Sequence, residues 1–335
     1  MLYENFLARL KETSEQEELQ SADARILSPA EPPLLPQSQA KKRTLLLALI
    51  LGGMAGVGIV FLLDKLNNTF RAPGQLEQLT GERVLGTIPA AGSNMHRHDV
   101  IKVLREQPKS SLAESVRSLR TSLLFSNVDR PPRSVMFTSS IPREGKSTSS
   151  MLVALTSRQM GKTAVIIDCD LRLPALARLL GADDDRPGLL SLIEGASTLE
   201  ESVFRDPETG LHVLMTKPHE PRSNINPADI LSSNRFRDII DDLKSRYDLV
   251  ILDTPPALVV ADAKILANQV DALVYAVRWD STPRGAVLEG LKDLRSVKAP
   301  IAGVILTLIN ESKAAKYSYD GYSYYKGRYK DYYVS

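Results

Sequence analysis

The run from Leu45 to Leu63, LLLALILGGMAGVGIVFLL, contains no charged residue over 19 positions. A helix needs about 20 apolar residues to cross the hydrocarbon core of a bilayer. Core helices of soluble domains rarely stay apolar on every face for that length. The run is also too long, and too far from the N-terminus, to be the apolar part of a cleavable signal peptide. We therefore expect a transmembrane helix over residues 44–66.

The segments on either side of this span differ in character. Residues 1–43 contain a short helical pattern and then a stretch with four prolines, SPAEPPLLPQSQ, which predicts a stiff, extended spacer. Residues 67–109 are interpreted as a juxtamembrane linker with a short helix and a strand in QLEQLTGERVLGTIP and a loop in AGSNMHRHDV. The two histidines of that loop show no metal-ligand spacing.

Residues 110–312 alternate between short apolar runs of β-forming residues and amphipathic helical patterns. Continuous apolar runs are typical of strands covered on both faces, and their alternation with helices favours a doubly wound, mainly parallel sheet. We predict a P-loop-like α/β domain here. The predicted strands are SVMFTS, TAVIID, LHVLMT, DLVILD, ALVYAV and IAGVILTLI.

Composition excludes some classes of function. The net charge of +2 offers no basic field for nucleic acid. A single cysteine, Cys169, cannot form an intramolecular disulfide, so the folded part is expected either in a reducing compartment or to need no covalent cross-link.

The stretch TSSIPREGKST (residues 138–148) follows a predicted strand and opens a predicted helix, as a Walker A loop does. In such a loop the backbone N–H groups surround phosphates, the lysine reaches the β- and γ-phosphates, and the serine binds Mg²⁺. Asn310, after the last strand, is a candidate for contact with adenine, or simply caps the strand end. The candidate ATP-binding residues are Ser140, Arg143, Glu144, Gly145, Lys146, Ser147, Thr148, Arg172 and Asn310.

Two other strands end in carboxylates. DLVILDTPP ends in Asp253, the Walker B position, and AVIIDCDLRLP ends in Asp168 and Asp170. Acidic groups at the carboxyl edge of a parallel sheet can divide two tasks, holding a metal and accepting a proton from an attacking hydroxyl. Either Asp168 or Asp170 could be the proton acceptor, and Asp168 is favoured. The candidate catalytic residues are Lys146, Asp168, Asp170 and Asp253, and the candidate Mg²⁺ ligands are Ser147, Asp170 and Asp253.

Residues 313–335 form a polar tail that contains eight of the eleven tyrosines. Its other residues are mostly Gly, Ser, Lys and Asp, which cannot build a core. A sticky aromatic tail is one interpretation; a set of phenol acceptors beside an ATP site is the other. The candidate acceptors are Tyr317, Tyr319, Tyr322, Tyr324, Tyr325, Tyr329, Tyr332 and Tyr333.

In this order and spacing, TSSIPREGKST, VIIDCDLR and VILDTPP resemble the Walker A, A′ and B motifs of the bacterial tyrosine kinases, the cytoplasmic part of polysaccharide co-polymerases. ESVRSLRTSL is similar to the family's Glu-x-x-Arg-x-x-Arg element, here Glu114, Arg117 and Arg120, which the family uses between subunits of a ring. The apolar span resembles the family's second membrane helix. Because the first helix and the periplasmic domain are absent, we expect a C-terminal portion or a short relative.

The resemblance implies a tyrosine autokinase that phosphorylates the tails of neighbouring subunits and thereby governs exopolysaccharide or capsule polymerisation and export. It also implies ATP and Mg²⁺ as cofactors, the export machinery and a cognate tyrosine phosphatase as partners, and a place in the bacterial inner membrane. Three basic residues, at positions 41–43, precede the span, and two, Lys65 and Arg71, follow it. This difference slightly favours a cytoplasmic N-terminus. The need for cytoplasmic ATP favours the opposite, with residues 1–43 periplasmic.

Two alternatives share the fold. A nucleotide-switch ATPase of the partitioning type would carry a signature lysine where Ile141 stands. A non-catalytic co-polymerase subunit would have a degenerate loop, and the two departures from the usual pattern are Ser140 and Arg143. A glycine is usual at the place of Arg143, so an arginine there is strained if the backbone needs a positive φ.

Overall fold

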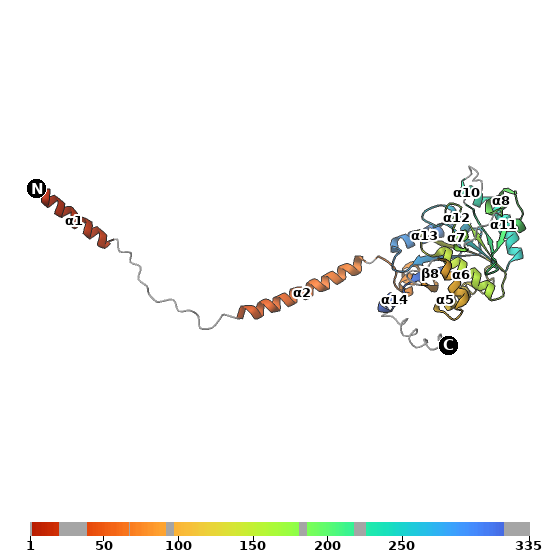
Figure 1. Cartoon of the computed structure of the whole chain (residues 1–335), viewed down its shortest axis with the longest axis horizontal. Helices are drawn as coiled ribbons and strands as arrows, with labels where there is room; N and C mark the ends of the chain where they lie inside the picture. Colours follow the sequence, from red (N-terminus) through yellow and green to blue (C-terminus); the bar gives the residue numbers. More distant parts are fainter. Residues whose placement is uncertain are drawn as a thin grey trace. The chain divides into compact units, whose positions relative to one another are not determined.

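The computed structural model describes residues 2–19, 39–66, 68–91, 97–180, 186–217 and 226–317 (Figure 1). The chain divides into two compact units, residues 1–66 and residues 67–335. The first unit contains α1 (Leu2–Leu19) and α2 (Gln39–Leu66). Within α2 the stretch Lys41–Leu62 has a mean hydropathy of 2.6 and buries none of its side chains, so it is long and apolar enough to cross a membrane. The proline-rich spacer lies almost wholly outside the described residues.

The second unit is built on an eight-stranded sheet with the order β1-β8-β7-β2-β6-β3-β5-β4. All neighbouring strands are parallel except β4 and β5, which are antiparallel. All six predicted strands of residues 110–312 are present, and the short edge strand β4 was not expected. The strands are β1 (Val84–Pro89), β2 (Ser134–Ser139), β3 (Ala164–Asp168), β4 (Val203–Arg205), β5 (His212–Leu214), β6 (Leu249–Asp253), β7 (Ala272–Arg278) and β8 (Ile301–Ile309).

Helices cover both faces of this sheet, each over its own hydrophobic core, which confirms the doubly wound architecture. The short helix α9 (Leu199–Ser202) precedes the edge strand β4. One face packs against α4 (Arg97–Glu106), α5 (Ser111–Leu124), α6 (Lys146–Gln159) and α7 (Leu176–Leu180). The other face packs against α3 (Pro73–Thr80), α8 (Leu189–Glu194), α10 (Pro227–Ser232), α11 (Asn234–Arg246), α12 (Asp262–Ala267) and α13 (Arg284–Ser296).

The stretch interpreted as a juxtamembrane linker joins this unit. Strand β1 pairs with β8 along the edge of the sheet, and Phe70 and Leu76 are fully buried. Residues 68–71 also bond to the turn after β7, where the Trp279 indole donates to the Arg71 carbonyl at 2.9 Å. This stretch joins the sheet because the strand and the two buried side chains complete a hydrophobic core that would otherwise face water. The expected loop over residues 91–100 needs a correction, because α4 begins at Arg97.

The predicted tail also begins differently. Helix α14 (Glu311–Tyr317) follows β8, so the first residues of the tail are helical rather than irregular. Asn310 caps this helix, since its side-chain oxygen accepts the Lys313 N–H at 3.0 Å. Of the candidate acceptor tyrosines, Tyr317 belongs to α14 and the other seven lie outside the described residues.

Candidate active site

The loop between β2 and α6 ends in a helix start that can bind an anion. Gly145 precedes α6 with φ +80°, a conformation that favours glycine, and an added Cβ would lie 3.2 Å from the Thr307 hydroxyl. The backbone N–H groups of residues 145–148 form no hydrogen bond within the described part of the chain. Unpaired N–H groups at the N-terminus of a helix are a ready site for phosphate.

Arg143 adopts the left-handed backbone conformation in which, from the sequence, we expected an arginine to be strained. Its φ is +68° and its side chain is exposed. A residue with a Cβ is strained there by roughly 1–2 kcal/mol. The loop thus retains the backbone geometry for which glycine is suited, although an arginine occupies the position.

Two other loop residues are turned into the protein. Ser140 is fully buried and its hydroxyl accepts a hydrogen bond from the Tyr275 phenol at 2.9 Å. Glu144 is only 1% exposed, and its carboxylate accepts the Ile141 N–H at 2.7 Å. We expected both residues to line the nucleotide site. Their side chains instead hold the loop from behind.

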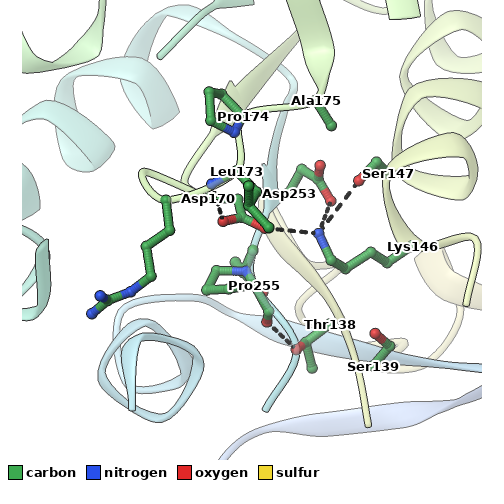
Figure 2. A network of polar contacts seen from close by, with 12 residues as sticks. Thr138, Ser139, Lys146, Ser147, Asp170, Leu173, Pro174, Ala175, Asp253 and Pro255 are labelled. Atoms are coloured by element: carbon green, nitrogen blue, oxygen red, sulfur yellow. Dashed lines mark hydrogen bonds and ion pairs between the residues drawn. The ribbon is translucent and has the colours of Figure 1, made fainter. Parts of the chain in front are cut away.

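Lys146 lies between the carboxylates of Asp170, in the loop after β3, and Asp253, at the end of β6 (Figure 2). Its ammonium nitrogen is 3.4 Å from Asp170 Oδ2 and 3.6 Å from Asp253 Oδ1, and it is 3.4 Å from the Ser147 hydroxyl. Burial alone would lower the pKa of Lys146, but the charges of the neighbouring aspartates outweigh burial and raise that pKa. The lysine is therefore a buried cation at the start of α6.

Asp253 ends β6 with an unsatisfied carboxylate. It is fully buried, and neither of its oxygens has a hydrogen-bond partner. Burial raises the pKa of Asp253, while Lys146 opposes that shift. An orphaned buried carboxylate beside a serine hydroxyl fits the oxygen ligands that Mg²⁺ prefers. Within the described ranges no group of three or more His, Cys, Asp or Glu could hold a metal by itself, so remaining ligands would come from water and phosphate.

Asp168 ends β3 beside Asp253, with which it is in register. One of its oxygens accepts the N–H groups of Ala175 and Leu176 at 2.9 and 3.0 Å, and the other accepts the Asp170 N–H at 3.2 Å. Burial, followed by the charge of Asp253, raises the pKa of Asp168 to about 8. Since backbone donors engage both oxygens, Asp168 is suited to holding the loop after β3.

Asp170 is 5% exposed and has a freer carboxylate. Its Oδ1 accepts the Leu173 N–H at 3.0 Å, while its Oδ2 lies 3.4 Å from the lysine ammonium (Figure 2). Compared with Asp168, it has one oxygen with no backbone donor. This carboxylate is the better placed of the two to accept a proton.

Two further candidates are engaged elsewhere. The Arg172 guanidinium pairs with the buried carboxylate of Asp262, at 3.2 Å, in place of the phosphate contact we expected. A buried carboxylate at the start of α12 requires a cation, and the arginine supplies it. Asn310 uses its side-chain oxygen to cap the start of α14, a role different from the adenine contact and the strand-end cap considered from the sequence.

The three residues expected at a subunit interface differ in their exposure. Glu114 and Arg117 pair with each other on α5 and stay partly exposed. Arg120 is only 7% exposed and donates to the Ser157 hydroxyl at 2.9 Å and to the Met160 sulfur at 3.2 Å, so it ties α5 to α6 within this chain. Burial lowers the pKa of Arg120. A contact of these three residues with another subunit stays a prediction.

Sequence reasoning missed the residues that support the loop from distant strands. Thr307 donates its hydroxyl to the Glu144 carbonyl at 2.6 Å, and Thr282 donates to the Glu144 carboxylate. Tyr275 holds Ser140 in the same way. Each lies more than 130 positions from its partner. A polar residue within an apolar strand, such as Thr307 in IAGVILTLI, is the only local signal.

Comparison with known proteins adds independent information. A family model described as an AAA domain matches residues 144–297. The tyrosine-protein kinase YwqD of Bacillus subtilis is 36% identical over 230 residues, which cover 69% of this chain and 94% of that protein. The succinoglycan biosynthesis transport protein ExoP of Rhizobium meliloti is 28% identical over 361 residues, which cover 99% of this chain and 45% of that protein. The chain thus spans less than half the length of that relative.

Among solved structures, the kinase domain of the Escherichia coli tyrosine kinase ETK superposes with a TM-score of 0.62 at 28% identity. It covers 71% of this chain and 94% of that domain. The similarity therefore spans nearly the whole of that kinase domain.

Proposed function

The chain belongs to the bacterial tyrosine kinases, and from this premise we propose that it is a membrane-anchored protein-tyrosine kinase that transfers the terminal phosphoryl group of ATP to tyrosine side chains. One observation carries the proposal. The start of α6 brings together four unpaired N–H groups, the ammonium of Lys146, and the carboxylates of Asp170 and Asp253 within 3.6 Å of that ammonium. These are the groups that phosphoryl transfer requires.

The roles follow from the contacts. Residues 145–148 bind phosphate oxygens through their N–H groups. Lys146 would exchange its carboxylate partners for the phosphates, and Asp253 with the Ser147 hydroxyl would hold Mg²⁺. When bound, Mg²⁺ neutralises charge that develops on the phosphate oxygens. The burial of Lys146 and Asp253 excludes water, which strengthens these electrostatic contacts.

We assign the proton of the attacking phenol to Asp170. A phenol with its ordinary pKa near 10 is protonated at neutral pH and must lose its proton as the bond to phosphorus forms. Asp170 Oδ2 has no backbone donor, whereas both oxygens of Asp168 are engaged. The preference for Asp168 that the sequence suggested therefore passes to Asp170, and Asp168 positions the loop that carries it.

The acceptors we propose are the tail tyrosines of neighbouring subunits. The tail leaves from α14, and α14 is fastened to the start of α5 by the Ser111 hydroxyl, which donates to Glu311 at 2.9 Å. The partly exposed pair Glu114 and Arg117 lies on the same helix α5. Each phosphate adds roughly −1.5 to −2 charges at neutral pH. Phosphorylated tails would then repel one another beside the contact between subunits and drive a ring apart.

The wider setting is proposed from the same family membership. Helix α2 anchors the chain in the inner membrane, and the kinase unit faces the cytoplasm because ATP is there, which puts residues 1–43 on the periplasmic side. The homo-oligomer acts with a polysaccharide polymerisation and export system, and a tyrosine phosphatase resets it. The support for this setting is that similar proteins are named as a succinoglycan biosynthesis transport protein and as a tyrosine-protein kinase.

The test uses the full chain in detergent or lipid with radiolabelled ATP. Wild-type protein should acquire alkali-stable phosphotyrosine, and Lys146→Met should lose it. Because this change also removes the cation beside two buried carboxylates, thermal melting must show that the variant is still folded under the assay conditions. To separate transfer between subunits from transfer within one, inactive Lys146→Met chains are mixed with active chains whose eight tail tyrosines are phenylalanine. Label on the inactive chain supports transfer between subunits, and its absence with normal wild-type labelling would refute it.

A further inference from the structure

Glu144 is a buried carboxylate inside a loop suited to anions. It directly precedes Gly145, whose N–H begins the row of unpaired donors, and only 1% of its surface is exposed. A negative charge so close to a polyphosphate site opposes binding by simple electrostatics. Burying a carboxylate is also costly unless it is hydrogen-bonded. The charge of Glu144 therefore does not explain why a buried glutamate occupies this position of the loop.

The hydrogen bonds of the side chain supply that role. One carboxylate oxygen accepts the Ile141 N–H at 2.7 Å, which closes the loop on itself. The other accepts the hydroxyl proton of Thr282, in the turn between β7 and α13. The Thr282 oxygen in turn accepts the Arg278 N–H at 3.0 Å. Because a hydroxyl has one proton, its donation is directed to Glu144. Both oxygens of Glu144 accept. Burial raises the pKa of Glu144, and these hydrogen bonds oppose that shift because they favour the ionised carboxylate.

The backbone of Glu144 is held from a second strand. Its carbonyl accepts the Thr307 hydroxyl of β8 at 2.6 Å, and the missing Cβ of Gly145 leaves room for that threonine. On the other side, Arg143 is held at φ +68°. A strained backbone conformation persists only where the contacts around it contribute more stability than the strain costs. The contacts of Glu144 to the turn after β7 and to β8 are such surroundings.

We propose that Glu144 and Thr282 form a positioning pair, which holds the loop in the shape that turns the N–H groups of residues 145–148 toward the phosphates. The carboxylate acts on the loop backbone and not on the nucleotide. This inference rests on the proposed nucleotide-binding function. It predicts that removing the negative charge weakens ATP binding, the reverse of the purely electrostatic expectation.

Glu144→Gln separates the two explanations. The amide keeps the size of the side chain and one accepting oxygen, but its NH₂ group must face either the Ile141 N–H or the Thr282 hydroxyl. Positioning predicts that the dissociation constant of a fluorescent ATP analogue rises about tenfold, equivalent to about 1.4 kcal/mol. The KM for ATP should rise similarly, with kcat at saturating ATP changed by less than about threefold. Unchanged or tighter binding would overturn the proposal.

Thr282 gives an independent test outside the loop. Thr282→Val removes the hydroxyl at nearly constant shape and should weaken nucleotide binding several-fold, whereas Thr282→Ser should restore it. The matched control is Thr156→Val in α6, because that threonine is also buried but its hydroxyl has no hydrogen-bond partner. The double variant with Thr282→Val and Glu144→Gln should lose less nucleotide affinity than the sum of the single losses, since both changes disrupt the same Glu144–Thr282 hydrogen bond.

Thermal melting of every variant without nucleotide separates positioning from a general loss of stability. Weaker binding at a melting temperature within a few degrees of wild type supports positioning. Weaker binding that merely follows a lower melting temperature, with no rescue by Thr282→Ser, refutes it. If the wild-type chain itself failed to bind the analogue, the proposed function would fail first.

Discussion

The carboxyl ends of β3 and β6 are neighbours in one sheet, and each ends in a fully buried aspartate, Asp168 and Asp253, in register with the other. Their surroundings differ. Asp168 accepts three backbone N–H groups, whereas both oxygens of Asp253 lack a hydrogen-bond partner. Two residues of the same type and burial therefore differ in their hydrogen bonding, although burial raises the pKa of both.

The difference shows how one sheet edge combines rigidity with chemistry. A carboxylate satisfied by backbone donors stabilises the fold and has little capacity left for a ligand. A carboxylate without donors costs free energy until a cation approaches, as Lys146 does in this structure. The aspartate at the end of β3 thus shapes the loop that carries Asp170, and the aspartate at the end of β6 is left open to a metal.

Replacing Asp253 should produce the largest effect. Asp253→Asn removes the proposed metal ligand, and we expect phosphotyrosine formation to fall roughly a thousandfold, equivalent to about 4 kcal/mol of transition-state stabilisation. The same change removes a fully buried carboxylate that has no hydrogen bond and only a 3.6 Å ion pair with Lys146, so the melting temperature without nucleotide should rise or stay constant. Labelling rates and calorimetry measure the two effects. A strong loss of stability would contradict the comparison between the strand ends.

The pH dependence of this variant sharpens the contrast. Burial raises the pKa of Asp253 above its ordinary value, so the folded state holds the proton more tightly than the unfolded state. The stability of the metal-free wild type should therefore decrease as the pH rises above the ordinary range of an aspartate. Asp253→Asn should show a shallower decrease. Urea unfolding between pH 4 and pH 8 would measure this, and parallel curves for the two proteins would refute the shift.

The next effect concerns Asp170. Asp170→Asn should lower the rate of transfer roughly a hundredfold, because a positioned base supplies about that much or more. ATP binding should change little, since the N–H groups of the loop remain. Single-turnover labelling at saturating ATP and nucleotide titration together test the assignment. A parallel loss of rate and binding would instead make Asp170 a ligand or a structural group.

A smaller effect, mainly on stability, is expected for Asp168. In Asp168→Asn the amide can accept at one oxygen only, so at least one backbone N–H loses its partner and unfolding should become easier by about 2 kcal/mol. At low temperature, where the variant is folded, activity should stay within about tenfold of wild type. A stable but inactive variant would return the role of proton acceptor to Asp168.

The smallest effect concerns the loop that faces both strand ends. Arg143→Gly relieves the positive φ, partly offset by the greater entropy of the unfolded glycine, for a net gain of about 0.5 to 1 kcal/mol. Arg143→Lys, which keeps a Cβ and a charge, is the matched control and should gain nothing. If glycine lowered the melting temperature, the arginine side chain would contribute to stability by a contact of its own.

Much of the fold could be predicted from local patterns. Six apolar runs of residues 110–312 are strands, and the uncharged run is a helix without buried side chains. Such features depend on which residues neighbour each other along the chain, because strand and helix periodicities are local. The loop, Lys146 and the three aspartates were found in the same way, since strand ends and helix starts mark the edge where they meet.

Other features depend on residues that are distant in sequence. No local pattern distinguishes Asp168 from Asp253, because both follow an apolar strand, and only the loop that folds back to Ala175 and Leu176 satisfies the former. Nor does a pattern tell that Arg120 is buried against α6 or that Arg172 pairs with Asp262. The sequence alone determined the main strands of the sheet and the edge that carries the chemistry, because hydrophobic periodicity is local. Tertiary structure decided which polar groups are satisfied, because a hydrogen bond requires its partner to lie within about 3 Å in space, whatever its place in the chain.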